Sequence, residues 1–146
     1  MFIAVLACCF LLVATTVLHY EVLGAMNAGL PSLRIPHRAK LVVVILGAFV
    51  AHVLEMALYG AVLYGLIAGL GIGSLTGSAG FSFATCMYFS AETYTSLGFG
   101  DVAPAGPIRL LAGVEALNGL LLIGWSASFT YIAMEKFWKE RPADQS

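Results

Sequence analysis

The chain has 146 residues, of which 60% are hydrophobic and 10% are charged, and its mean hydropathy is +0.93. A water-soluble domain carries roughly a quarter charged residues, so this composition predicts a membrane protein. The net charge is −1 at pH 7, and the seven Lys and Arg residues do not gather on one basic face, which argues against a nucleic-acid partner.

The N-terminal segment, residues 1–27, is predicted to be a transmembrane helix. Phe2 begins an apolar run that holds no charged residue before Glu21, and roughly 20 mostly apolar residues are enough to cross a bilayer. A cleaved signal peptide, the alternative, would begin with basic residues, but the first Lys or Arg is Arg34. The sequence does not indicate what this first span does.

Residues 28–40 are predicted to be a basic loop, because prolines break helices here and cationic side chains gather between two apolar stretches. These residues are Pro31, Pro36, Arg34, Arg38 and Lys40. The positive-inside rule places this loop and the short basic tail, residues 137–146, in the cytoplasm. The N-terminus is then expected outside, with Arg109 as the lone Lys or Arg near that face.

Residues 41–136 are predicted to form one unit of two spans and an intervening loop. The outer helix is expected over residues 41–70 and the inner helix over residues 108–135. The glycine-rich stretch 71–80 predicts a flexible turn, and residues 82–95 are too short to span, which is typical of a re-entrant helix. The expected fold class is an all-α membrane protein with three transmembrane helices plus a re-entrant helix and the loop after it.

The glycine-spaced hexapeptide after the re-entrant helix carries the strongest chemical signal. An ion that crosses hydrocarbon must exchange its water shell for protein oxygens, which a ring of backbone carbonyls can supply. Such a strand needs dihedrals that side chains disfavour, and Gly98 and Gly100 permit them at alternate positions. Leu97 and Phe99 would point outward and brace the strand, and Ser96 would add a hydroxyl oxygen.

Three stretches around this hexapeptide resemble one known family. Residues 93–101, Thr-Tyr-Thr-Ser-Leu-Gly-Phe-Gly-Asp, resemble the potassium-channel signature T-x-x-T-V-G-Y-G-D. Residues 88–93, Tyr-Phe-Ser-Ala-Glu-Thr, are similar to the W-W-S-x-E-T pore helix of the bacterial proton-gated potassium channels, and residues 102–104, Val-Ala-Pro, resemble their L-Y-P. The resemblance covers about residues 83–131 and includes the order span, pore helix, filter, span.

The resemblance implies a homotetrameric potassium channel in the cell membrane, with residues 96–101 as its selectivity filter and Gly100 completing the filter strand. The carbonyl groups implied to bind K⁺ belong to Ser96, Leu97, Gly98 and Phe99. The hydroxyl of Ser96 would complete the innermost site. Ser, Leu and Phe stand where the family has Thr, Val and Tyr, so potassium selectivity is expected to survive with less margin.

The residues expected to support the filter are Glu92, Asp101, Tyr88 and Thr95. The resemblance implies that Asp101 lies behind the outer mouth of the filter, hydrogen-bonded to Glu92 of the pore helix. Two carboxyl groups buried side by side are expected to share one proton.

Ionisable side chains inside spans are costly and point to function. His52 and Glu55 are three residues apart and therefore lie on one helix face. We expect them to form either a structural pair or a proton sensor, because histidine titrates near neutrality. Glu115, with Asn118 one turn later, is expected either to pack behind the filter or to face the ion path.

Small residues of the inner helix are candidates for gating. Gly119 and Gly124 fall where inner helices of the resembled family bend, so each is a candidate hinge or a point of close packing. Ser126 is expected either to line the inner cavity or to bond its own helix.

Nothing in the sequence indicates an enzyme, because no nucleophile with a base, metal-ligand spacing or phosphate-binding loop is present. No span carries the regularly spaced arginines of a voltage sensor. The expected partners are further copies of the chain and membrane lipids, and no cofactor is expected besides the permeant K⁺. The alternatives are a weakly selective cation channel and a non-conducting subunit that regulates other channels.

Overall fold

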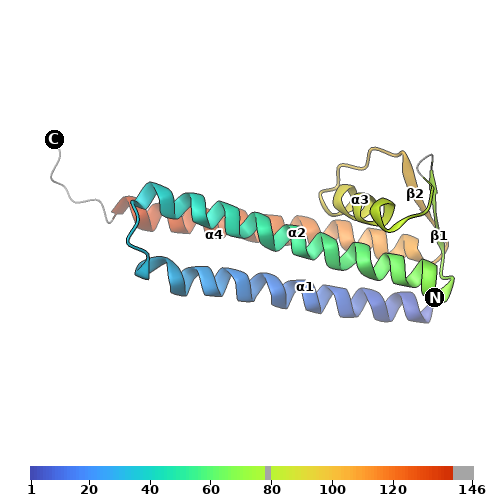
Figure 1. The fold of residues 1–146 in the computed structure, drawn as a ribbon. Helices are drawn as coiled ribbons and strands as arrows, with labels where there is room; N and C mark the ends of the chain where they lie inside the picture. The colour runs from blue at the N-terminus through green and yellow to red at the C-terminus, as the bar shows by residue number, and fades with distance from the viewer. Residues whose placement is uncertain (78–79, 140–146) are drawn as a thin grey trace.

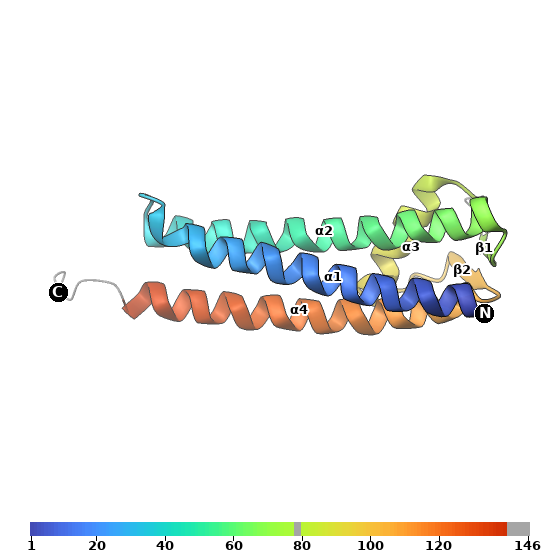
Figure 2. The same cartoon turned by 90° about the horizontal axis from the view of Figure 1, so that it is seen from below.

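The computed structural model describes residues 1–77 and 80–139, and three long helices form its frame (Figure 1). They are α1 (Phe2–Gly29), α2 (His37–Leu70) and α4 (Ile108–Lys139). Each is long and apolar enough to cross a membrane, with mean hydropathies of 2.4, 2.4 and 1.5 in the apolar windows. They lie side by side, and the N-terminus and the end of α4 are at opposite ends of the bundle (Figures 1 and 2). The chain is therefore a multi-pass membrane protein.

A short helix and a two-stranded sheet fold against the end of the bundle that holds the N-terminus (Figure 1). The helix, α3 (Phe83–Tyr94), has 12 residues and cannot cross a bilayer. It begins at Ser82, whose side-chain oxygen accepts a hydrogen bond from the backbone N–H of Thr85 and so caps the first turn. The antiparallel strands are β1 (Ser74–Gly77) and β2 (Val102–Ala105). The predicted all-α membrane fold with three spanning helices is confirmed.

The prediction of a loop over residues 28–40 is wrong in extent. The first helix continues to Gly29, a 3-10 turn covers Leu30–Ser32, and α2 already begins at His37. Pro36 directly precedes α2 instead of breaking it, because the first turn of a helix does not need the backbone N–H that proline lacks. Two of the three basic residues of this region therefore belong to the start of α2.

The prediction of a flexible turn over residues 71–80 is also wrong for the part that forms β1. This strand pairs with β2, with Gly77 opposite Val102, while residues 78 and 79 lie outside the described residues. A Cβ at Gly77 would lie 2.3 Å from the carbonyl oxygen of Asp101. Glycine here permits the close approach of two backbones, and the pairing offsets its low strand propensity.

The inner helix is longer than predicted. It was expected to end at residue 135, but α4 continues to Lys139, so the first residues of the predicted tail are helical. The rest of that tail, residues 140–146, lies outside the described part of the chain.

The first span packs one buried face against α2 and α4. The buried residues of this face are Ala4, Cys8, Leu11, Thr15, His19 and Leu23, which recur every three or four positions. The main apolar core lies where the four helices meet, around Tyr59, Leu63, Phe89 and Leu111. This core fixes α3, and hence the segment after it, against α2 and α4, the two spans of the predicted unit 41–136.

Candidate functional site

The predicted filter segment has an alternating backbone. The φ angles of Ser96, Gly98 and Gly100 are 57°, 54° and 80°, whereas Leu97 and Phe99 between them do not have positive φ. In an ordinary strand successive carbonyl groups point to opposite sides, but alternation between left-handed and right-handed residues turns them to the same side. The two glycines adopt this conformation without steric cost, and Ser96 adopts it with a cost.

The N–H groups of the filter segment are directed at the end of α3. Four successive groups donate hydrogen bonds there, those of Ser96, Leu97, Gly98 and Phe99. The first donates to Thr93 O at 3.0 Å, the next two to Glu92 O at 2.9 and 3.3 Å, and the last to Glu92 Oε2 at 3.2 Å. Within the described part of the chain, the carbonyl oxygens of the same four residues accept no hydrogen bond. A carbonyl oxygen without a partner is costly away from water. These four oxygens therefore need a ligand from outside the described part of the chain.

The partners of the two carboxylates near the filter differ from the expected ones. Instead of the expected bond to Asp101, Glu92 accepts from the backbone N–H of Phe99, and Asp101 Oδ1 accepts from the hydroxyl of Tyr88 at 3.2 Å. The strand β2 begins directly after Asp101 and pairs with β1, which helps to fix the position of this residue. Thr95 donates its hydroxyl to Ala91 O at 2.8 Å, within the last turn of α3.

The filter segment lies open on one side of the chain. The side chains of Leu97 and Phe99 are large and apolar, yet they are 63% and 68% exposed. A groove of about 320 Å³ runs beside the segment, between α3, β2 and α4, and Ala112 and Ala116 of α4 form part of its wall. Exposed apolar side chains beside an open groove are typical of a surface that another protein surface covers.

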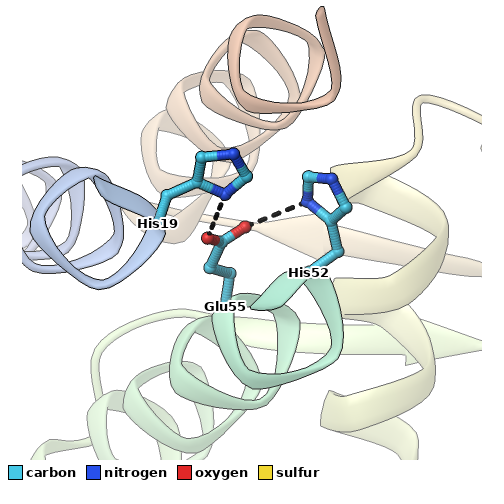
Figure 3. A group of neighbouring side chains, drawn as sticks. All are labelled: His19, His52 and Glu55. Atoms are coloured by element: carbon cyan, nitrogen blue, oxygen red, sulfur yellow. Dashed lines mark hydrogen bonds and ion pairs between the residues drawn. The ribbon is translucent and has the colours of Figure 1, made fainter. Parts of the chain in front are cut away.

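The predicted pair His52 and Glu55 belongs to a larger buried network. Glu55 lies at hydrogen-bond distance from His52 Nδ1 (3.1 Å) and His19 Nδ1 (2.8 Å), and it accepts a hydrogen bond from the hydroxyl of Tyr94. The same hydroxyl lies 2.9 Å from His52 Nδ1. Figure 3 shows the two imidazole rings on either side of the carboxylate. The network thus joins α1, α2 and the last residue of α3. Ser126 of α4 is buried and contacts both imidazole rings, which differs from both expectations for it, lining the inner cavity or bonding its own helix.

Sequence reasoning missed His19 and Tyr94. The signal for His19 was present, because an ionisable residue inside an otherwise uncharged span calls for a partner. The partner lies 36 positions later in the chain, and spacing within one helix does not reveal contacts between helices. Tyr94 carried no such signal, because an aromatic residue at the end of a short semi-apolar helix fits many roles.

Glu115 and Asn118 face the interior of the chain. Glu115 is 1% exposed and accepts a hydrogen bond from the hydroxyl of Ser90 in α3. Asn118 donates to Thr15 Oγ1 at 2.7 Å and to the hydroxyl of Tyr59 at 3.2 Å. The carboxylate of Glu115 therefore packs against α3 inside the chain, which agrees with the expected buried position more than with one facing an ion path.

The two candidate hinge glycines differ in their surroundings. A Cβ at Gly119 would lie 2.1 Å from the carbonyl oxygen of Tyr94, so α3 and α4 touch closely at this point. A Cβ at Gly124 would meet nothing within 4 Å. The first glycine thus has a packing role in this structure, and the second meets no neighbour among the residues that the structure describes.

Comparison with known proteins identifies the family. A family model described as "Ion channel" matches residues 39–136, which include all of β1, α3 and β2 and most of α2 and α4. No curated protein and no solved structure matches the chain. Because the matched region covers well over half of the 146 residues, the chain is a member of this ion channel family.

Proposed function

We propose that the chain is one subunit of a homotetrameric, potassium-selective channel that conducts K⁺ passively through residues 96–101. The observation that carries this proposal is the direction of the filter hydrogen bonds. Four N–H groups are used by the end of α3, and the carbonyl oxygens of the same residues accept no hydrogen bond within the described part of the chain. These oxygens, from Ser96 to Phe99, would replace the water around a dehydrated K⁺. The hydroxyl of Ser96 would add a ligand at the inner end.

The proposed tetramer follows from what one chain lacks. A single strand supplies one side of a carbonyl ring, and a closed ring needs rotational symmetry about the ion path. The exposed side chains of Leu97 and Phe99 and the groove beside them support this assembly, because neighbouring subunits would cover them. The bundle itself supports membrane placement of every subunit, since three of its described helices can span.

Reversal potentials of purified, liposome-reconstituted protein test the proposal. With a tenfold K⁺ gradient balanced by Na⁺, we expect the current to reverse within a few millivolts of the K⁺ equilibrium potential, about 59 mV from zero. A reversal potential near zero would contradict potassium selectivity and favour the weakly selective cation channel. An absence of K⁺ flux from correctly assembled protein would favour the non-conducting regulatory subunit.

We propose that this channel lies in the cell membrane with its N-terminus outside and its C-terminus in the cytoplasm. The proposal rests on Arg38 and Lys40 at one end of the bundle and on Lys139 at the same end, against Arg109 at the other (Figure 1). A reporter fused after residue 146 is expected to resist protease added to intact cells. Digestion of the reporter by external protease would contradict this orientation. It would mean that the C-terminus is outside and that the filter mouth faces the cytoplasm.

A further inference from the structure

The cluster of His19, His52 and Glu55 gathers three metal-binding side chains from two spans. One ligand atom from each lies within 4.8 Å of the other two, and Figure 3 shows both rings directed at the carboxylate. The side chains of His19 and Glu55 are 0% exposed and that of His52 is 16% exposed. The cluster is therefore enclosed between the helices, where an uncompensated carboxylate is costly.

A count of protons shows that neutral imidazoles and an ionised Glu55 leave this cluster one positive charge short, which a proton or a metal ion can supply. Both Nδ1 atoms lie at hydrogen-bond distance from Glu55, and both Nε2 atoms lie at hydrogen-bond distance from Ser126 Oγ, at 3.2 Å for His19 and 3.0 Å for His52. A neutral imidazole carries only one N–H. If both rings donate to Glu55, both Nε2 atoms must accept, and the single O–H of Ser126 can serve only one of them. The neutral rings therefore leave one contact without a proton and the carboxylate without a counter-charge.

We propose that His19 Nδ1, His52 Nδ1 and the carboxylate of Glu55 bind a divalent transition-metal ion of the zinc class. With both Nδ1 lone pairs on the ion, both Nε2 atoms carry hydrogen and donate to Ser126 Oγ, whose two lone pairs accept both. The similar distances of the two Nε2 atoms from this oxygen agree with two equivalent donors. An outer partner on the second nitrogen is what a metal-bound histidine ordinarily has.

The donor set selects the class of metal. Two imidazoles and one carboxylate suit Zn²⁺ and its neighbours, whereas Ca²⁺ and Mg²⁺ require sites built mainly from oxygen. Tyr94 keeps its hydrogen bond to Glu55, so the ion would tie α1 and α2 to the end of α3, two residues before Ser96. One ligand, His19, lies outside the region matched by the ion channel family, so the site depends on the first span.

Metal binding to the full-length protein in lipid nanodiscs tests this site. After chelator treatment, exposure to Zn²⁺ and desalting, the wild type is expected to retain about one zinc ion per chain. Co²⁺ in place of Zn²⁺ is expected to give the intense visible absorption of a site with low coordination number. Added Zn²⁺ should displace the Co²⁺ and remove this absorption. The variant His19→Gln should retain no metal. The matched control is His37→Gln at the first residue of α2, about four helical turns from His52, and it should bind as the wild type does.

A third variant keeps the test informative if His19→Gln does not assemble. Ser126→Ala retains all three ligands and removes only the oxygen that accepts from both rings, so its affinity should fall about ten- to hundredfold. The proposal is overturned if the wild type retains no Zn²⁺ and its Co²⁺ sample shows no intense visible absorption. It is equally overturned if His37→Gln loses the metal as His19→Gln does. The additional cation in the cluster would then be a proton.

Discussion

Replacement of Gly98 by alanine is expected to abolish K⁺ conduction, with flux in reconstituted liposomes falling more than about tenfold to the level of protein-free liposomes. The residue has a φ of +54°, and a Cβ added there would meet nothing within 4 Å, so the effect is one of backbone conformation and not of collision. An L-residue with this φ costs about 1–2 kcal/mol, and a ring of four copies about 4–8 kcal/mol. The strand would relax toward negative φ and turn the adjacent carbonyl group away from its neighbours.

The matched control is Gly65→Ala. Gly65 lies within α2, has no positive φ, and also has open space where a Cβ would be. Gly65→Ala adds the same methyl group as Gly98→Ala, but at a residue without positive φ. The K⁺ flux of this variant should therefore equal that of the wild type. Undiminished K⁺ flux through assembled Gly98→Ala protein would contradict the role we assign to this backbone.

The sequence was sufficient for the number and order of the helices, although not for all of their ends. Long apolar runs and their ends at Gly71 and Pro107 marked the spans, and the predicted re-entrant helix, residues 82–95, became α3 at Phe83–Tyr94. The positive φ angles of Gly98 and Gly100 are where an alternating strand would require them. These features depend on local properties of the chain, such as run length, glycine and proline, which a single sequence displays directly.

The sheet and the partners of the carboxylates depend on contacts between distant residues. The strand at Ser74–Gly77 is stabilised by residues 102–105. Each stretch has four residues with a single β-branched one, Thr76 or Val102, which is too short a pattern to predict a strand. Likewise, the family pattern suggested that Glu92 and Asp101 bond each other, whereas Phe99 N–H and the Tyr88 hydroxyl are their partners here. Spacing along the chain could not select between these arrangements.

The first span shows both what a single sequence reveals and what it does not. Its apolar composition identified it as a transmembrane helix, but its role depends on polar residues that find partners elsewhere. Thr15 accepts a hydrogen bond from Asn118 of α4, and His19 binds Glu55 of α2. Polar contacts inside a low-dielectric bundle fix the rotation of a helix more tightly than apolar packing alone. The first span therefore stabilises α2 and α4, the two helices that hold α3. Its own sequence could not reveal this role.

The second large effect is expected from Gly119→Ala, which should destabilise the contact between α3 and α4. The new Cβ would lie 2.1 Å from Tyr94 O and 2.9 Å from Tyr94 C, both backbone atoms that cannot rotate away. Overpacking of this kind typically costs about 1–3 kcal/mol per chain. Tyr94 is also the residue that bonds Glu55, so a displaced α3 would weaken the buried network. We expect a lower melting temperature and less tetramer in size-exclusion chromatography.

Gly124→Ala is the variant that separates an effect on packing from an effect on helix bending. It adds the same methyl group five residues later in α4, but into open space. Within a helix, alanine is favoured over glycine by up to about 1 kcal/mol, so this variant should melt no lower than the wild type. If α4 bends at Gly124 when the channel opens, the stiffer helix should lower the open probability while the protein remains tetrameric. If instead Gly119→Ala assembles normally and only its opening changes, α4 hinges at Gly119, and the close contact with Tyr94 must loosen during gating.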